Sequence, residues 1–351
     1  MNKIFLIFLF FLTTFRVDGK TNYNDIVLTD EFVCALTQSG SLTFFDKQTG
    51  KPITPNLDKN FDFTNISTDI NGRLIVVDQK NNIKRLNHDN KTFELIGTTE
   101  LKLFYVLFNS KNECYVITEK GIESIKTGKI YFSDKSLNHQ IRYKDKWGKP
   151  YCCFIDRTDK IWLGFGYGEW GGNLFIFETL KNKFTSPILD NFNIALWPVK
   201  SFFEDDTCTY LSSGLQHMMT SGTIIKFKNM KASTLFNSES KYSESIGKDS
   251  VRTMIDAEYI GPTTYNKYDK SIYFYSQNGF FKGNVSKDLS KIDNWTNILK
   301  PKLHWIYGQP DAVGSPMNVY KILIIDNNRF VFLTQNDGIG YYDGQNLAMY
   351  D

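Results

Sequence analysis

The sequence predicts an all-β protein, a β-propeller of seven four-stranded blades, from three observations. Aromatic residues make up 15% of the 351 residues, and aromatic residues favour strands. Short apolar runs recur in pairs around Gly or Asn turns, which is the pattern of a β-hairpin. The first run of each pair starts at residue 33, 74, 114, 161, 209, 272 or 330. Steps of roughly 40 to 50 residues between paired strands are typical of propeller blades, and the first four of the six steps are of this length.

One further strand flanks each hairpin on either side, which makes four strands per blade, lettered A to D from the inside of the ring outward. The paired B and C strands are Val33–Leu36 with Leu42–Phe45, Leu74–Val77 with Ile83–Leu86, Cys114–Ile117 with Ile122–Ile125, Ile161–Leu163 with Leu174–Phe177, Thr209–Leu211 with Ile224–Phe227, Ile272–Tyr275 with Phe280–Phe281, and Phe330–Leu333 with Ile339–Tyr342. The A strands include Ile26–Leu28, Leu103–Phe108, Tyr151–Ile155 and Tyr320–Ile325, and the D strands include Phe93–Ile96, Lys129–Phe132 and Leu347–Met349. A β-sandwich would not need seven similar units, and a β-helix would need a shorter period. The two longest steps, before residues 272 and 330, leave room for an irregular extra blade.

The N-terminus has the pattern of a targeting segment. Lys3 gives a positive start, and the nine apolar residues Ile4–Leu12 are too few to span a bilayer. Small residues precede a possible cut after Gly19. The sequence therefore predicts a signal peptide over residues 1–19, a single propeller domain over residues 20–351, and a secreted or periplasmic protein. An uncleaved membrane anchor is the alternative.

Charge and cysteine content exclude several classes of protein. The 41 basic and 38 acidic residues nearly balance, so no electrostatic footprint for nucleic acid is present. The five cysteines are an odd number and lie mostly in separate repeats, which favours small buried hydrophobic residues over a disulfide framework. Four histidines without a spaced cluster do not suggest a metal site. We expect no metal, no cofactor, no membrane insertion after signal cleavage, and a monomer.

Blade 4 carries the closest resemblance to a known repeat. Asp156–Gly164 (DRTDKIWLG) followed by Gly172–Glu178 (GNLFIFE) resembles the two-component-regulator propeller repeat, and Asp69–Gly72 and Gly338–Asp343 match parts of it. In that family the propeller is usually the extracellular or periplasmic sensor region of a larger membrane kinase. The resemblance therefore implies a propeller outside the cytoplasm. Because no second transmembrane segment and no kinase region are present, we expect a free-standing secreted member, and signalling is not implied.

The long connections are predicted to gather on one end of the ring. In a four-stranded blade, the B–C hairpins and the connections from a D strand to the next A strand open on the same end, which we call the top; the A–B and C–D turns open on the bottom. The long segments are the B–C hairpins Gly164–Asn173 and Ser212–Thr223 and the connections Asp134–Pro150, Asp190–Pro198, Asn237–Ile255 and Leu299–Asn318. All belong to the top of blades 4 to 7, and binding loops on rigid scaffolds concentrate in this way.

These loops hold aromatic and charged side chains that predict a ligand-binding surface. The candidates are Arg142, Trp147, Tyr167, Glu169, Trp170, Trp197, His217, Trp305 and Tyr307. In the hairpin Gly164–Gly172, alternating glycines would let the backbone approach a ligand while Tyr167 and Trp170 stack on a flat or sugar-like surface. No helix follows this hairpin, which excludes a phosphate-binding loop. The alternative is that the aromatic residues only pin long loops to the scaffold.

Three functions follow from these features. The first is non-catalytic binding of a protein, peptide or glycan through the top-face loops of blades 4 to 7. The second is a propeller-type carbohydrate-active lyase or hydrolase, with His217 and His304 as acid–base candidates and Glu169 as a further one, although the local Ser, Cys and zinc enzyme motifs are absent. Catalysis would need two or more titratable groups at a common point, and His139 and Glu258 are further groups to compare. The third is a structural component of a secreted assembly.

Overall fold

The computed structural model describes residues 22–55, 57, 62–87, 91–167, 171–217, 219–238, 242–243, 253–254, 257–304 and 318–351. The predicted signal peptide therefore lies outside the described residues. Among the described residues, no helix is long and apolar enough to cross a membrane. Nearly all of the regular structure is antiparallel β-sheet, as the aromatic and hairpin patterns predicted.

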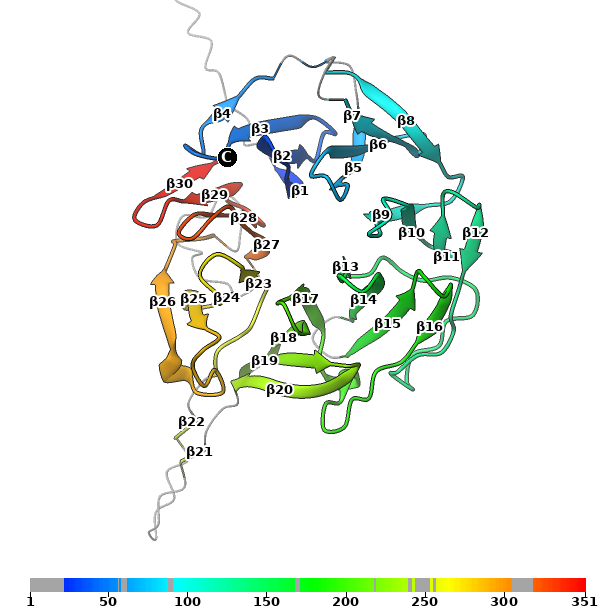
Figure 1. Cartoon of the computed structure of the whole chain (residues 1–351). Helices are drawn as coiled ribbons and strands as arrows, with labels where there is room; N and C mark the ends of the chain where they lie inside the picture. The colour runs from blue at the N-terminus through cyan, green and yellow to red at the C-terminus, as the bar shows by residue number, and fades with distance from the viewer. Residues whose placement is uncertain are drawn as a thin grey trace, which may run out of the picture.

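Seven four-stranded sheets are arranged in a ring (Figure 1), which confirms the predicted propeller and its number of blades. Blades 1 to 3 contain β1 (Tyr23–Leu28), β2 (Phe32–Thr37), β3 (Leu42–Asp46), β4 (Pro52–Ile53), β5 (Phe63–Thr68), β6 (Leu74–Asp78), β7 (Asn82–Leu86), β8 (Phe93–Thr98), β9 (Leu103–Phe108), β10 (Cys114–Thr118), β11 (Gly121–Ser124) and β12 (Lys129–Tyr131). Blades 4 and 5 contain β13 (Cys152–Ile155), β14 (Lys160–Gly166), β15 (Gly172–Glu178), β16 (Lys183–Thr185), β17 (Val199–Glu204), β18 (Thr209–His217), β19 (Met219–Lys228) and β20 (Lys231–Ser238). Blades 6 and 7 contain β23 (Thr263–Asn266), β24 (Ser271–Ser276), β25 (Gly279–Asn284), β26 (Trp295–Leu299), β27 (Val319–Ile324), β28 (Phe330–Thr334), β29 (Ile339–Tyr342) and β30 (Leu347–Tyr350).

The remaining elements are short. A two-stranded sheet of β21 (Tyr242–Ser243) and β22 (Thr253–Met254) lies in the connection between blades 5 and 6. Two 3-10 turns, η1 (Ile194–Leu196) and η2 (Ile292–Asn294), complete the described elements. The long step before blade 6 thus carries a small hairpin insertion, and the described residues contain no eighth blade.

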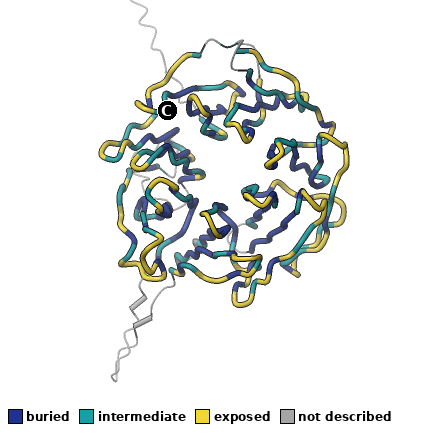
Figure 2. The backbone as a smooth tube through the Cα atoms, in the orientation of Figure 1, coloured by how far each residue is buried: buried dark blue, intermediate teal, exposed yellow. Residues whose placement is uncertain are grey.

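The first strand of each blade lies at the inside of the ring. Each of these A strands contacts the A strand of the next blade, all the way around, including β27 with β1. The buried residues follow the strands, and the exposed residues follow the turns and outer edges (Figure 2). The ring therefore places the start of every A strand, reached from a top-face connection, close to the ring axis.

Large side chains fill the space between neighbouring blades. Trp162 of blade 4 is fully buried and packs against Phe202 and Phe227 of blade 5, with ring centroids 6.0 and 5.0 Å apart. Comparable clusters of buried apolar residues lie at the other seams. Burial of such aromatic surface is the main stabilising contribution to a propeller core.

The cysteines take part in this packing as unpaired thiols. All five are free, and Cys34, Cys114 and Cys208 are buried at the starts of B strands or just before them. The predicted preference for buried small hydrophobic residues over a disulfide framework agrees with this arrangement.

The A–B turns at the bottom share one hydrogen-bonding pattern. In blade 4, Asp156 Oδ1 accepts from the backbone N–H of Thr158 (2.8 Å) and Lys160 (3.0 Å), and Oδ2 accepts from Trp162 Nε1 (2.8 Å). Asp69 and Asn109 accept the same two backbone N–H bonds, from the residues two and four positions later, and Asp205 and Asp326 accept from the residues two and three positions later. This turn explains physically why an Asp or Asn recurs at the start of the A–B turns.

Among the described residues, the ring closes without exchanging a strand between the first and last blades. Each blade consists of four consecutive strands, so blades 1 and 7 meet only through side chains and loops. Lys321 forms an ion pair with Asp25 (2.8 Å), and the hydroxyl of Tyr341 donates to the carbonyls of Lys47 (3.1 Å) and Gln48 (2.9 Å). A buried apolar cluster between the two blades completes the seam.

Candidate functional site

The long top-face connections of blades 4 to 7 are present as predicted. They join β12 to β13, β16 to β17, β20 to β23 and β26 to β27, and β18–β19 forms the longest hairpin of the ring. Most bottom-face turns are shorter; the exception is the ten-residue connection between β25 and β26 in blade 6. The expected asymmetry between the two faces is therefore a property of the structure.

Trp147 is a core residue, which corrects its assignment as a ligand-binding residue. Its side chain is 2% exposed, and its Nε1 donates to the carbonyl of Ser133 (3.1 Å). It packs against Phe132 and Phe175, with ring centroids 5.4 and 5.1 Å apart. Trp147 therefore attaches its long loop to the scaffold, which was the alternative interpretation, because a buried indole cannot stack on a ligand.

Gly166 and Gly172, at the two ends of the hairpin after β14, serve close packing between blades 4 and 5. A Cβ at Gly172 would lie 2.1 Å from the carbonyl oxygen of Trp197, and one at Gly166 would lie 3.0 Å from Pro198. Neither glycine has a positive φ. These two glycines therefore make room for the connection into blade 5. Gly171 in the same hairpin has a φ of +94°, and the expected approach of this hairpin to a ligand stays a prediction.

Tyr167 is also anchored to the scaffold. Its ring stacks on that of Phe165 (centroids 6.1 Å apart), and its hydroxyl contacts the hydroxyl of Tyr143. Tyr143 in turn accepts from Asn173 Nδ2 (3.2 Å), and burial raises the pKa of the Tyr143 hydroxyl to about 12. These contacts tie the connection before blade 4 to that blade while leaving Tyr167 half-buried.

The other candidates fall into two groups. Arg142 is exposed and Trp197 is half-buried, so both remain available at the top of blades 4 and 5. Glu169, Trp170, Trp305 and Tyr307 lie outside the described residues, as does the side chain of His217, whose backbone belongs to β18. The ligand-binding assignment of these residues stays a prediction.

The titratable candidates that the structure describes lie on different segments and do not contact one another. Glu258 accepts from Ser276 Oγ (2.5 Å) and Asn278 Nδ2 (2.8 Å) on the hairpin of blade 6. His304 pairs through Nδ1 with Asp337 Oδ1 (2.6 Å), and its backbone N–H donates to Oδ2 of the same carboxylate (2.8 Å). His139 is exposed on the connection before blade 4. Within the described part of the chain, no group of three or more His, Cys, Asp or Glu could hold a metal ion.

A cluster that we did not predict lies at the inner ends of blades 4 to 7. We call Tyr151, Lys200, Tyr259 and Tyr320 the axial cluster. The ammonium of Lys200 lies 4.8 Å from the ring centroid of Tyr151 and 5.8 Å from that of Tyr259. Burial raises the pKa of the Tyr259 hydroxyl, and neighbouring tyrosines, including Tyr151 and Tyr320, raise it further. Side chains from four blades thus converge near the ring axis at its top end.

Strand irregularities aim two members of this cluster. The register of β17 against β18 shifts between Val199 and Ser201, which leaves Lys200 as the extra residue of a β-bulge. The register of β27 against β28 shifts in the same way around Tyr320. A bulge re-aims a side chain that a regular strand would send elsewhere, so these two residues leave the usual alternation at corresponding places.

One sequence signal for the axial cluster was available. Lys200 is the one charged residue in the run from Ile194 to Phe203 (IALWPVKSFF), which otherwise reads as a turn and a buried strand. A charge inside such a run is unusual, because burying it costs free energy unless it is paired. The three tyrosines gave no comparable signal, since they lie in three distant segments.

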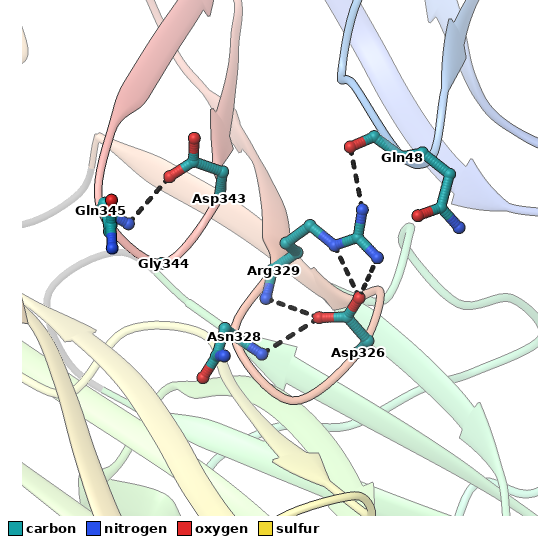
Figure 3. Close-up of a pocket in the computed structure, with 7 residues that line it drawn as sticks. All are labelled: Gln48, Asp326, Asn328, Arg329, Asp343, Gly344 and Gln345. Carbon is teal, nitrogen blue, oxygen red and sulfur yellow. Dashed lines mark hydrogen bonds and ion pairs between the residues drawn. The ribbon is translucent and has the colours of Figure 1, made fainter.

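A second polar feature lies on the bottom at the seam between blades 7 and 1. It is an open depression of about 600 Å³ (Figure 3), lined by Gln48, Asp326, Asn328, Arg329, Asp343, Gly344 and Gln345. Arg329 donates through Nε to Asp326 (2.6 Å) and through a terminal nitrogen to the carbonyl of Gln48 (2.8 Å). Asp343 accepts from the backbone N–H of Gln345 (2.8 Å). The polar groups of the depression bond to one another, so their presence is explained by the contact between blades 7 and 1 that closes the ring.

Comparison with known proteins gives structural likeness only. No family model matches the chain, and no curated protein matches it. Among solved structures, it is similar to the extracellular domains of a one component system and of a hybrid two component system from B. thetaiotaomicron. The TM-scores are 0.54 and 0.53 and the identities 12% and 13%, over 93% of this chain in both cases. The chain spans 38% and 40% of the length of those two chains.

A third similar structure matches in length as well. It is the β-propeller domain of the Trilobed protease from Pyrococcus furiosus, at TM-score 0.52 and 11% identity, covering 95% of this chain and 98% of that one. That domain is described as having an open velcro topology, and in the present ring, likewise, no strand passes between the first and last blades. At these identities the likeness shows the fold alone: this chain is a seven-bladed β-propeller of the kind found in the extracellular domains of those regulators.

Proposed function

We propose that the protein is a non-catalytic binding propeller that holds a protein, peptide or glycan partner on the top-face loops of blades 4 to 7. The observation that carries this proposal is the asymmetry of the ring. Most of its long connections lie at the top of those blades, whereas the bottom turns, apart from the connection over residues 285–294 in blade 6, are short, and Asp156 shows how they satisfy their own polar groups. A rigid scaffold with irregular loops at one end is the usual arrangement of a binding module.

The proposed place of action is outside the cytoplasm, secreted or periplasmic. The N-terminal segment with Lys3, Ile4–Leu12 and Gly19 supports export. Structural likeness to extracellular domains agrees with this. Sensing or signalling, which the neighbouring proteins' names describe, is not part of the proposal.

Paired variants of the two faces test the proposed binding. We expect His139→Ala/Arg142→Ala, two exposed residues of the connection before blade 4, to weaken binding of an array-identified peptide or oligosaccharide at least about tenfold. The matched control is Arg157→Ala/Lys228→Ala, two exposed residues of the bottom turns, which we expect to bind as the wild type does. Loss of binding in the bottom variant alone would move the site to the other face.

The alternative is a carbohydrate-active lyase or hydrolase, and the His304–Asp337 pair favours it. The carboxylate of Asp337 binds Nδ1 of His304, and Nε2 has no partner among the described residues. The imidazole is therefore oriented as it would be in an acid–base catalyst. The oligosaccharides that bind on the array are therefore incubated with the protein and followed for cleavage. Chain shortening that His304→Gln abolishes would support the enzyme, and unchanged oligosaccharides would support binding alone.

A further inference from the structure

We propose that the axial cluster is an oxyanion-binding site, in which Lys200 and the surrounding tyrosine hydroxyls receive one carboxylate or phosphate group of a ligand. The ligand would enter along the ring axis from the top face. This inference rests on the proposed function only in assigning ligand binding to the top end of the ring. It names a different set of residues, at the inner strands instead of the outer loops.

The first support is that the polar groups of the axial cluster, two of them on largely buried residues, lack partners within the chain. Lys200 is 6% exposed and Tyr259 is 2% exposed. Across the described residues, neither the Lys200 ammonium nor the hydroxyls of Tyr151, Tyr259 and Tyr320 has a hydrogen-bond or ion-pair partner. Tyr320 is 42% exposed, and none of these four polar atoms is among the fully enclosed atoms without a partner, so a ligand can reach them. Buried polar groups in folded proteins are almost always satisfied. A partner from outside the chain would satisfy them here.

The second support is the chemistry of the four groups. An ammonium donates hydrogen bonds and cannot accept them, and a tyrosine hydroxyl donates readily. A single group that accepts from all of them needs several lone pairs and favours a negative charge, which describes a carboxylate or a phosphate. The flat faces of Tyr151 and Tyr259 next to the ammonium would line the way in.

The third support is the contrast with a neighbouring lysine. Lys321 follows Tyr320 directly on β27, and its ammonium pairs with Asp25 at 2.8 Å. No carboxylate in the described structure plays this part for Lys200; the neighbouring ionisable group is the Cys152 thiol, whose pKa burial raises, so it stays neutral. The inner ring therefore neutralises one cation and leaves the other uncompensated.

Contacts with the aromatic rings alone do not explain Lys200. Cation–π attraction favours the protonated amine, but burial lowers the pKa of Lys200 from 10.5 to about 8. Desolvation is the largest cause of this shift, and no carboxylate among the described residues offsets it, so the charge of the ammonium lacks a negative partner. A bound oxyanion would reverse this balance by supplying the missing negative charge.

Thermal unfolding of the purified full chain tests the proposal with two probes. Sodium acetate and sodium phosphate are titrated separately at neutral pH, with sodium chloride keeping the ionic strength constant. We expect one or both to raise the Tm saturably, because a ligand that binds only the folded state stabilises it. A response to acetate identifies a carboxylate ligand, and a response to phosphate identifies a phosphoryl ligand.

Three variants make the result specific. Lys200→Met replaces the amine with an apolar chain of similar length, and we expect it to weaken the probe's affinity at least about tenfold while the protein stays folded. Tyr259→Phe removes one hydroxyl and should weaken it about threefold. Lys228→Met, an exposed lysine of the same blade, should respond as the wild type does.

Two results would overturn the oxyanion site. One is the absence of a saturable Tm increase in the wild type with either probe. The other is an equal increase in the wild type and in Lys200→Met, which would assign the effect to other sites. Neither result bears on the loop variants at His139 and Arg142, so failure of this inference and failure of the proposed function can be told apart.

Discussion

The two faces of the ring differ in how they treat a buried charged side chain. At the bottom, Asp156 accepts four hydrogen bonds, from two backbone N–H groups, the hydroxyl of Thr158 and the indole of Trp162. At the top, Lys200 is equally buried and has neither a hydrogen bond nor an ion pair within the described structure. Repeated polar groups at the bottom complete the fold, whereas the unsatisfied group at the top costs stability.

This difference teaches where function is to be sought in a repeat protein. A motif that recurs in blade after blade, such as the Asp turn, is explained by what each blade needs to fold. A buried group that occurs in one blade and is not satisfied needs another explanation. The polar depression on the bottom, at the seam of blades 7 and 1, belongs to the first kind, because Arg329, Asp326 and Gln48 satisfy one another.

Removal of the Asp156 carboxylate is expected to have the largest effect on stability. Asp156→Ala leaves two backbone N–H groups and the buried indole N–H of Trp162 without their acceptor, so the free energy of unfolding should fall by about 4 kcal/mol. Urea unfolding measures this loss.

Asp156→Asn is the matched control for that variant. Asn109 occupies the equivalent turn of blade 3 and accepts the same two backbone bonds, so an amide can form the turn. Only the bond to Trp162 should be lost, at a cost of about 1 to 2 kcal/mol. Equal losses for the two variants would contradict the assigned role of the backbone acceptor.

Substitution of Gly172 tests whether the top connections are packed as firmly as the bottom turns. A Cβ there would lie 2.1 Å from the carbonyl oxygen of Trp197 and 3.1 Å from that of Ile194. The connection into blade 5 would have to move, so Gly172→Ala should lower the free energy of unfolding by about 3 kcal/mol.

The control for Gly172→Ala is Gly148→Ala. Gly148 is exposed, and a Cβ at this position would meet no atom within 4 Å. Its effect should stay within about 0.5 kcal/mol. If Gly172→Ala were as harmless in urea unfolding, the connection into blade 5 would be loosely packed, and the hairpin glycines would be free for the ligand contact that the sequence suggested.

The sequence predicted the fold closely because the fold rests on local patterns. Each predicted B strand starts within one residue of the observed one, from Phe32 of β2 to Phe330 of β28. Paired apolar runs and turn residues contain this information, and the period assembles it into a ring. The long top connections were predictable for the same reason, since they are what remains between the repeats.

The site was less predictable because its residues meet only in three dimensions. Trp147 in a long polar segment suggested a ligand contact, but an aromatic side chain there serves the core equally well, and the structure buries it. Lys200 depends on a β-bulge that no composition rule reveals. Its neighbours Tyr151, Tyr259 and Tyr320 come from three other blades or connections, and nothing in their local sequences marks them.

The pH dependence of stability sharpens the comparison at Lys200. Burial lowers the pKa of this lysine to about 8 in the folded chain, from 10.5 when it is exposed. Between these values the unfolded chain binds one more proton than the folded chain, so the contribution of Lys200 to stability rises with pH. Below pH 8 the full cost of burying the charge is present, about 3 kcal/mol.

The measurement compares Lys200→Met with the wild type in urea unfolding at about pH 7 and about pH 10. The variant should be the more stable at the lower pH, and its advantage should shrink by about 2 kcal/mol at the higher pH. The groups facing Lys200 do not obscure this, because burial raises the pKa of Cys152, Tyr151, Tyr259 and Tyr320 and keeps them neutral over most of the range. Lys228→Met, which is exposed, should show no such change. A difference that is independent of pH would mean that the Lys200 ammonium is hydrated in the folded protein, and the top of the ring axis would then be as well satisfied as the bottom turns.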